Sequence, residues 1–246
     1  MLTQLAAAVR SLATYVAVAL YVLVLGPPVL VLALATGSPR LLYGVGIRGV
    51  RLGLGLSGIR TQVVGGEHIQ RRRAAVYAVN HTSNVEPPIV FDALGGLFPR
   101  LRMLYKAELR KLPVLVRAFD LAGFVPIDRG KTEQSLAAID RAAAALAEGY
   151  SFVIFPEGTR SRTGALLPFK KGGLVMAIKG HAPVVPVAIA GARRAMRKGS
   201  PLIYPVTVTV RFGAPIETAG MTVDDRDALV ARVRGEVERM LEAAAC

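Results

Sequence analysis

The sequence predicts an α/β domain over residues 57–246, preceded at residues 1–56 by a membrane-associating motif of two apolar helices and a basic bridge. From residue 57 onward, short apolar runs typical of strands alternate with helical patterns. By contrast, residues 11–39 contain no charged side chain, which is conspicuous even in a chain of 246 residues that is 52% hydrophobic. This composition excludes a disordered protein and indicates one globular domain with an apolar appendage.

The charge balance indicates an anionic partner. The chain holds 31 Lys and Arg residues against 17 Asp and Glu residues, which gives a formal net charge of +14. An excess of this size favours a membrane surface, a phosphorylated substrate or a nucleic acid. Because the chain has no tryptophan and an aromatic content of 6%, we expect no nucleic-acid partner.

Cysteine and histidine usage limits the chemistry further. The sequence has one cysteine, Cys246, so neither an intrachain disulfide framework nor a cysteine-based metal site is expected. With three histidines, a multi-histidine metal site is also disfavoured, and His68 and His181 lie in loops without a carboxylate at a useful spacing. We therefore expect no metal and a reducing, cytoplasmic environment.

The uncharged N-terminal segment predicts two helices rather than one. As a straight helix with a rise of ~1.5 Å per residue, residues 11–39 would extend about 43 Å, well beyond the ~30 Å hydrocarbon core of a bilayer. Pro27 and Pro28 each remove a backbone donor, and Pro28 also disfavours a helical conformation of the preceding residue. We therefore expect the helix to break near Gly26.

Three interpretations of this segment are open. It is a hairpin that dips into one leaflet, a single kinked transmembrane span, or a signal peptide cleaved after Ala33-Leu34-Ala35. Basic residues flank both of its ends: Arg10 on one side, and Arg40, Arg48 and Arg51 on the other. Because this arrangement keeps both ends on the cytoplasmic side, we favour the hairpin and expect the protein at the cytoplasmic face of the cell membrane.

Six apolar runs bounded by turn residues predict the strands of the α/β domain. They span residues 59–64, 74–79, 123–127, 151–155, 184–189 and 207–212. Ahead of the first run, residues 47–56 form the basic, glycine-rich bridge. The second run ends at Asn80 and His81, and the fourth ends at Pro156, so both lead into loops.

Two helices are predicted between these strands. One face of residues 134–148 is apolar and contains Leu136, Ile139, Ala143 and Leu146. Gly149 stops this helix, and Gly180 stops a shorter one over residues 172–179.

The last predicted helix spans residues 224–243. Thr222 and Asp225 have the spacing of a capping box at its start. Its apolar stripe consists of Leu229, Val230, Val233, Val237, Met240 and Leu241. We expect this stripe to pack against the core.

A candidate catalytic pair follows the run 74–79. The sequence continues there as Asn80-His81-Thr82-Ser83-Asn84-Val85-Glu86. In α/β folds, functional side chains collect where strands end. If the loop folds back, Glu86 accepts a hydrogen bond from one ring nitrogen of His81, and the other nitrogen can deprotonate an alcohol. The spacing alone is more typical of a structural pair, and it is the position at a strand end that favours the catalytic interpretation.

A second candidate site follows the run 151–155. It reads Phe155-Pro156-Glu157-Gly158-Thr159-Arg160-Ser161. Gly158 allows close approach of a ligand, Thr159 offers a hydroxyl group, and Arg160 can bind a phosphate through paired N–H bonds. Arg129 places a second arginine after the run 123–127. Taken singly, each arginine is also compatible with a solvated surface charge.

Together, these segments resemble the lysophosphatidic acid acyltransferase family, the 1-acyl-sn-glycerol-3-phosphate acyltransferases within the glycerolipid acyltransferases. The resemblance covers residues 60–215. It rests on His81 with an acid five residues later, Gly123-x3-Ile127-x-Arg129, Phe-Pro-Glu-Gly-Thr-Arg from Phe155, and Val-Val-Pro-Val from Val184. The family's first block normally ends in Asp, and here it ends in Glu86, whose extra methylene still reaches His81 if the loop adjusts.

The resemblance implies a fold with a mixed sheet flanked by helices, and a reaction without metal or prosthetic group. His81 would remove the proton from the sn-2 hydroxyl of 1-acyl-sn-glycerol 3-phosphate, and Glu86 would orient its imidazole. The alkoxide would attack the thioester of acyl-CoA or acyl carrier protein, giving phosphatidic acid. The family's phosphate and glycerol site corresponds to Arg129, Glu157, Gly158, Thr159 and Arg160. Lys106 would lie near the thioester or the phosphate.

Other functions remain open from the sequence. Within the same class they are a glycerol-3-phosphate, lysophospholipid or lyso-aminolipid acyltransferase, whose motifs overlap. From another class, the rival is a non-catalytic basic protein that binds membrane or nucleic acid. Further basic residues predict a surface for anionic headgroups or acyl carrier protein: Arg193, Arg194, Arg197 and Lys198, with Arg100, Arg102, Lys106, Arg110 and Lys111.

Overall fold

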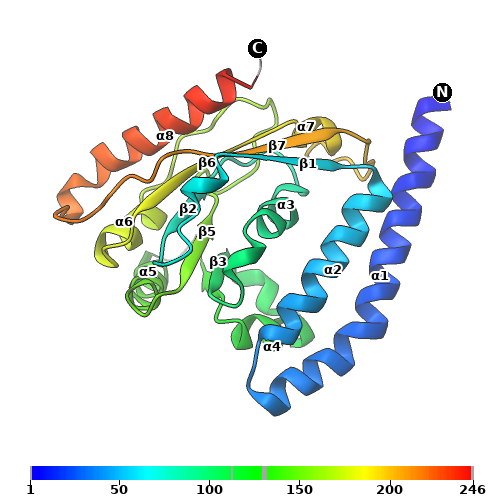
Figure 1. The fold of residues 1–246 in the computed structure, drawn as a ribbon, viewed down its shortest axis with the longest axis horizontal. Coiled ribbons are helices and arrows are strands. Elements are labelled where there is room, and N and C mark those ends of the chain that lie inside the picture. The colour runs from blue at the N-terminus through cyan, green and yellow to red at the C-terminus, as the bar shows by residue number, and fades with distance from the viewer. Residues whose placement is uncertain (1, 112, 129–131, 245–246) are drawn as a thin grey trace.

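The computed structural model describes residues 2–111, 113–128 and 132–244. They form a seven-stranded mixed sheet with helices on both faces, and two long N-terminal helices lie along one side of it (Figure 1). The predicted fold class is therefore confirmed.

The sheet has the order β1-β7-β6-β2-β5-β3-β4. Its strands are β1 (Arg60–Val64), β2 (Val76–Val79), β3 (Leu101–Lys106), β4 (Val125–Ile127), β5 (Ser151–Ile154), β6 (Val184–Ala190) and β7 (Thr207–Phe212). β6 and β7 are antiparallel, and the other neighbouring pairs are parallel. The six predicted strands are present, whereas β3 was not predicted.

Helices cover both faces of the sheet. They are α3 (Glu86–Ala93), α4 (Pro113–Leu121), α5 (Thr132–Ala147), α6 (Gly172–Lys179), the short α7 (Ala192–Ala195) and α8 (Arg226–Glu242). α5, α6 and α8 pack on one face in a core that includes Val76 and Ala78. α3 packs on the other face with Tyr77 and Val79 (Figure 1). Successive residues of β2 thus point into opposite cores, as strand geometry requires.

The predicted helix faces are largely confirmed. In α8, Leu229, Val233 and Val237 are buried, and Thr222 and Asp225 form the capping box at the start of the short helix that precedes it. In α5, three of the four predicted residues are buried, but Leu136 is 52% exposed. The prediction for Leu136 is wrong because α5 turns this residue towards solvent.

The predicted helix break at Gly26 is also wrong. α1 runs without interruption over Leu2–Thr36, so the predicted hairpin within residues 11–39 is not formed. The hairpin of the structure consists of α1 and α2 (Arg40–Ser57), and its turn lies at residues 37–39. α1 bends towards its carboxyl-terminal end (Figure 1), which is the usual response of a helix to internal proline. The predicted bridge, residues 47–56, is helical and lies within α2.

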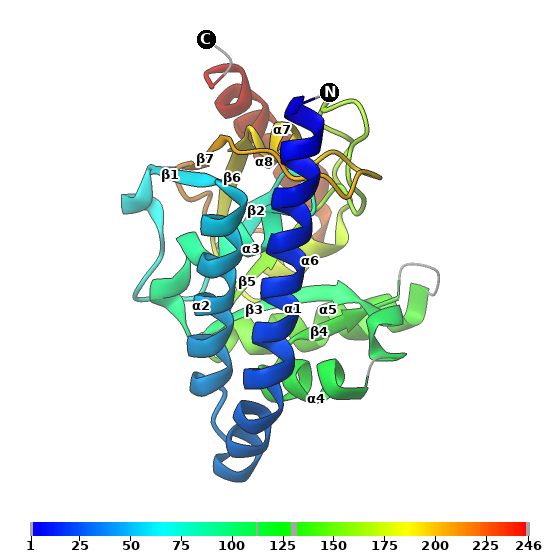
Figure 2. The same cartoon turned by 90° about the vertical axis from the view of Figure 1, so that its right-hand side faces the viewer.

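Packing between α1 and α2 explains why α1 continues. The two helices lie side by side and antiparallel (Figure 2). A Cβ atom at Gly49 would lie 2.9 Å from the Tyr21 ring, and one at Gly53 would lie 3.2 Å from Val18. The glycines of α2 therefore allow the close approach of α1, and the Tyr21 hydroxyl donates a hydrogen bond to the Val45 carbonyl. This contact outweighs the local preference of the prolines.

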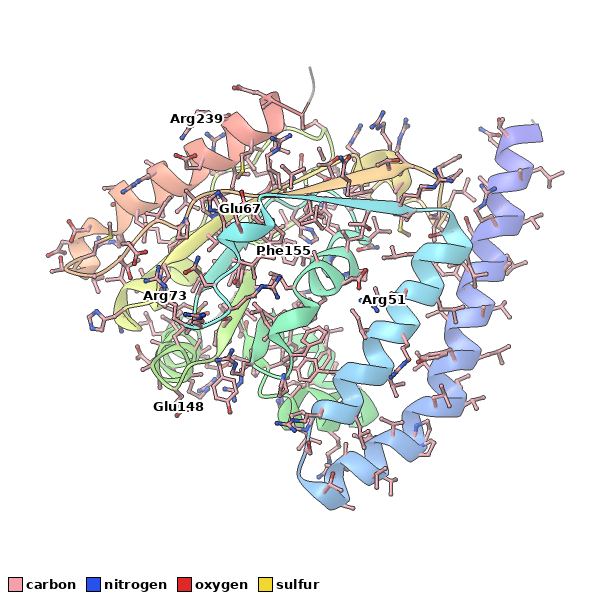
Figure 3. The ribbon with its side chains drawn as sticks, in the orientation of Figure 1. Arg51, Glu67, Arg73, Glu148, Phe155 and Arg239 are labelled. Carbon is pink, nitrogen blue, oxygen red and sulfur yellow. The ribbon has the colours of Figure 1, made fainter. Side chains whose placement is uncertain are left out.

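The hairpin is attached to the α/β domain along its length. The Ile203 backbone N–H donates a 2.7 Å hydrogen bond to the Ser11 hydroxyl, and the Tyr43 hydroxyl donates one to the Leu101 carbonyl. Arg51 reaches from α2 to Asp92 of α3, with 2.8 Å between Nε and Oδ1 (Figure 3). The hairpin and the domain therefore form one packed unit.

The outer face of α1 is apolar and exposed. Its large exposed side chains include Leu5, Val9, Leu12, Val16, Leu20, Leu23, Val24 and Val31. Among the described residues, Thr3–Thr36 is the one helix whose length and apolar composition suffice to cross a membrane, with a mean hydropathy of 2.5. A patch of this size indicates a membrane or protein contact.

Candidate active site

The candidate site lies at the carboxyl edge of the central strands. β2 lies between β5 and β6 and is parallel to both, so the three strands end at the same edge. His81 follows β2, and Glu157 follows β5. The sheet therefore brings together the two loops that the sequence predicted as functional.

His81 and Glu86 are in contact. The distance from His81 Nδ1 to Glu86 Oε2 is 2.8 Å. Glu86 is the first residue of α3 and is fully buried, whereas the His81 side chain is 18% exposed. The glutamate therefore reaches the histidine despite its extra methylene, and the other ring nitrogen, Nε2, is left for a substrate.

The Glu86 carboxylate is held by further donors. The backbone N–H of Thr82 donates to both of its oxygens, at 3.0 and 2.8 Å, and the Thr82 hydroxyl donates to Oε1 at 2.5 Å. The start of α3 adds the positive end of the helix dipole. Pro87 and Pro88 are tolerated there because the first turn leaves its N–H groups without helical partners. These donors stabilise a buried negative charge beside His81.

The backbone of His81 is fixed by the loop after β5. Its N–H donates a 2.5 Å hydrogen bond to Glu157 Oε1, and its carbonyl accepts one of 2.7 Å from the Ser161 N–H. The second oxygen of Glu157 accepts the Leu167 N–H at 3.0 Å. Burial raises the pKa of the Glu157 carboxyl, and the two N–H donors oppose that rise. Through these contacts Glu157 positions His81.

Two features of the structure require a glycine at residue 158: the backbone conformation there and the close Lys170 side chain. The φ of Gly158, +70°, lies in the left-handed region that favours glycine. A Cβ atom there would lie 2.9 Å from Lys170 Cε, because the Lys170 side chain lies across this loop. The glycine therefore allows a lysine to approach the peptide beside the catalytic loop.

Thr159 and Arg160 lie next to a second lysine. Lys198 Nζ donates to the Thr159 hydroxyl at 3.3 Å and to the Arg160 carbonyl at 2.8 Å. The Thr159 side chain is exposed, and Arg160 is half-buried. The structure thus brings together His81, Glu86, Glu157, Gly158, Thr159 and Arg160, all predicted for the site.

Two predicted residues remain, Lys106 and Arg129. Lys106 ends β3 at the same edge of the sheet, with its side chain 57% exposed and 2.9 Å from Glu108 Oε1. Arg129 lies outside the described residues.

Several positioning residues were missed by the sequence reasoning. Asn80 pairs its side-chain amide with the backbone of Ile189, which ties the end of β2 to β6. The Ser83 hydroxyl donates to the Met196 carbonyl at 2.7 Å. Asn80 and Ser83 are buried polar residues. The signal in the sequence that could have identified them is that both are polar and lie within two residues of His81.

An apolar cavity of about 650 Å³ opens between the hairpin and the domain. Val85 and Pro87, on either side of Glu86, belong to its lining, so the cavity reaches the start of α3 next to the catalytic pair. Its aromatic walls come from Tyr15, Tyr21, Tyr43, Phe91, Phe98, Phe119 and Phe124. Such a lining suits an acyl chain.

Comparisons with known proteins agree with this geometry. A model of the acyltransferase family matches residues 60–190. The chain is 35% identical over 205 residues to a 1-acyl-sn-glycerol-3-phosphate acyltransferase of Limnanthes douglasii, covering 82% of this chain and 70% of that protein. It is 32% identical over 180 residues to the human 1-acyl-sn-glycerol-3-phosphate acyltransferase alpha, covering 73% and 62% of the two chains.

A solved structure has the same fold. The crystal structure of the 1-acyl-sn-glycerophosphate acyltransferase PlsC from Thermotoga maritima matches 99% of this chain and 98% of its own, with a TM-score of 0.84. The sequence identity is 24%, so this likeness concerns the fold.

Proposed function

The chain belongs to the acyltransferase family, and we propose that its His81–Glu86 pair moves an acyl chain from a thioester to the sn-2 hydroxyl of 1-acyl-sn-glycerol 3-phosphate. The product is phosphatidic acid. The observation that carries the proposal is the 2.8 Å contact between His81 and the buried Glu86, at the edge where the acceptor loop also lies. It is the arrangement that activates an alcohol for acyl transfer.

The reaction follows from the groups present. His81 Nε2 takes the proton of the hydroxyl, and Glu86, bound at Nδ1, stabilises the imidazolium that forms. The alkoxide oxygen bonds to the thioester carbonyl carbon. When the tetrahedral intermediate collapses, the carbon–sulfur bond breaks and the thiol leaves with the proton from His81. The donor is acyl-CoA or acyl carrier protein.

A purified-protein assay tests the proposal. Acyl-CoA and acyl carrier protein are each paired with lysophosphatidic acid, glycerol 3-phosphate, a lysophospholipid and a lyso-aminolipid. We expect the highest kcat/KM with lysophosphatidic acid and phosphatidic acid as the product. A higher kcat/KM with one of the other acceptors would reassign the substrate, and no transfer to any of them would favour a non-catalytic protein.

Arg160 is assigned to the acceptor phosphate. Arg160→Ala should raise the KM for lysophosphatidic acid about tenfold or more, because an arginine–phosphate pair is charge-assisted and often bidentate. Arg129→Ala should act in the same direction and more weakly. Steady-state kinetics with each substrate varied in turn measures the effect. If the KM for the acyl donor alone changes, the phosphate has been assigned to the wrong residue.

The hairpin is assigned to one leaflet at the cytoplasmic face of the cell membrane. α1 presents an exposed apolar face, while its other side is bound to α2 and to the loop before β7. A perpendicular span would carry the attached domain into the hydrocarbon, where its polar groups would lack water. Lying in one leaflet, the hairpin holds the site at the surface where the lyso-lipid resides.

Substitutions on the exposed face test this assignment without truncation. Truncating residues 1–40 would remove Ser11 and Tyr15, which hold the loop before β7. Leu12→Glu with Leu23→Glu, at positions 65% and 69% exposed, should instead move the protein to the soluble fraction. Activity on vesicle-embedded acceptor should fall at least about tenfold, and activity on a water-soluble short-chain acceptor should persist.

The control is Leu136→Glu, an exposed leucine of α5 outside the hairpin. It should leave membrane binding unchanged. Topology is read by labelling cysteines placed at Thr3 and Ser38 with Cys246 removed. Both should be labelled from the cytoplasmic side alone, and labelling from opposite sides would replace the leaflet hairpin with a transmembrane span.

A further inference from the structure

A group of cations without carboxylate partners surrounds the loop after β5. In the described part of the chain, the members of this group form no ion pair, and each lies in the loop or contacts it: Arg160, Arg162, Lys170, Arg193 and Lys198. By contrast, Lys171 is paired with Asp227, and Arg110 is paired with Asp120. Uncompensated cations gathered beside a catalytic pair indicate a site for an anion.

Lys198 is the cation most closely tied to the catalytic loop. Its ammonium contacts two neutral oxygens, the Thr159 hydroxyl and the Arg160 carbonyl. The peptide that carries this carbonyl donates its N–H, through Ser161, to the His81 carbonyl at 2.7 Å. One peptide unit therefore separates the ammonium of Lys198 from the backbone of His81. An ammonium has three donors, so a third is available to an anion.

Lys170 approaches the same loop at Gly158. Its backbone N–H donates a 2.8 Å hydrogen bond to the Pro156 carbonyl, which fixes the start of its side chain. Its Nζ lies 3.2 Å from the position that a Cβ atom of Gly158 would occupy. Any side chain at residue 158 would displace this lysine. The glycine is therefore needed both for the positive φ of the loop and for the close approach of Lys170.

The substrate's dimensions place its phosphate near these lysines. In 1-acyl-sn-glycerol 3-phosphate, only the C2–C3–O–P linkage separates the reacting hydroxyl from the phosphorus atom. When the hydroxyl contacts His81, this short linkage keeps the phosphate close to the His81 ring, and the loop that carries Gly158 and Arg160 contacts the His81 backbone. We propose that Lys170 and Lys198 bind the acceptor phosphate together with Arg160 and determine the preference for a phosphate-bearing acceptor. This inference rests on the function proposed above.

The experiment uses full-length protein and five single variants. Lys198→Gln and Lys170→Gln remove one charge each while keeping an amide donor. Lys171→Gln and Lys179→Gln are the matched controls: Lys171 adjoins Lys170 and is paired with Asp227, and Lys179 ends α6 and is paired with Asp140. The readouts are kcat and KM for lysophosphatidic acid, KM for the acyl donor, and the dissociation constant of glycerol 3-phosphate measured without donor.

We expect the Lys198→Gln and Lys170→Gln variants to lose about 10–100-fold in kcat/KM for lysophosphatidic acid, mainly through KM, as removal of a hydrogen bond to a charged group predicts. Their donor KM should not change, glycerol 3-phosphate should bind more weakly, and Lys198→Arg should restore binding. The two control variants should behave as the wild type within about twofold.

Two results would overturn the inference. One is unchanged glycerol 3-phosphate affinity in both lysine variants. The other is a fall in kcat alone that is equal for lysophosphatidic acid and for the phosphate-free acceptor 1-acylglycerol, which would show that Lys198 and Lys170 only support the loop. If the wild type does not acylate lysophosphatidic acid, the proposed function fails, while glycerol 3-phosphate binding still tests the two lysines.

Discussion

Replacement of His81 by alanine should lower kcat for acyl transfer to lysophosphatidic acid by about 10²–10⁴-fold, the usual contribution of a positioned base. The imidazole is the group between the buried Glu86 and the substrate, and no other described histidine adjoins Glu86. The measurement is the initial rate of phosphatidic acid formation with purified protein at saturating donor and acceptor. Turnover within about tenfold of the wild type would exclude His81 as the base.

The fold should survive this change. The His81 ring packs against Phe155, with 4.3 Å between ring centroids, but the contacts that hold its loop are made by the backbone and by Thr82 and Glu157. Far-UV circular dichroism and the thermal midpoint should therefore match those of the wild type. His68→Ala is the matched control, because His68 is partly exposed and lies beside Glu67 at a distance of 3.9 Å. It should keep full activity.

The strands around the site could be predicted because their sequences are unusually apolar. β2, β5 and β6 are central and buried on both faces, so they appear as short continuous runs of apolar residues. β3 lacks this signal because Arg102 and Lys106 interrupt it. Arg102 stacks on the ring of Tyr150, with 3.4 Å between its Cζ atom and the ring centroid. No local pattern in the sequence predicts that contact.

The hairpin shows where local reasoning fails. Pro27 and Pro28 predict a break when α1 is considered alone. The close approach of α2 at Gly49 and Gly53 provides the packing that keeps α1 helical. These glycines belong to the next helix, so a local reading of the sequence around Pro27 and Pro28 does not include them. From the sequence alone these glycines indicate a bridge, because spacing does not reveal that their partner is Tyr21.

The sequence predicts which residues form the site, but not the role of each of them. The position of each block at a strand end brought His81, Glu86 and Arg160 to one edge of the sheet. The sequence assigned Glu157 to the substrate, yet both of its oxygens accept backbone N–H groups in the structure. Lys170 was not singled out, because a lysine in an exposed loop has no signal until the fold brings it across Gly158.

The pair Glu86→Gln and Glu86→Asp separates the charge of residue 86 from its length. In Glu86→Gln, an amide replaces a carboxylate that accepts from His81 and from Thr82, so a donor faces donors and the imidazolium loses its partner. We expect kcat to fall by up to about 10⁴-fold, the size of effect seen when the acid of a catalytic triad becomes an amide. Glu86→Asp retains the charge and restores the residue usual in the family, so its kcat should stay within about tenfold of the wild type.

These outcomes are read from kcat and KM measured on the same protein preparations, with thermal midpoints to confirm folding, because Glu86 is fully buried. The KM for both substrates should change little in either variant, since Glu86 is shielded from the substrate and acts through the His81 ring. If Glu86→Gln turns over as fast as the wild type, the carboxylate does not orient the base. If Glu86→Asp is folded but as inactive as Glu86→Gln, then the reach of the longer side chain to Nδ1, rather than its charge alone, is what this loop requires.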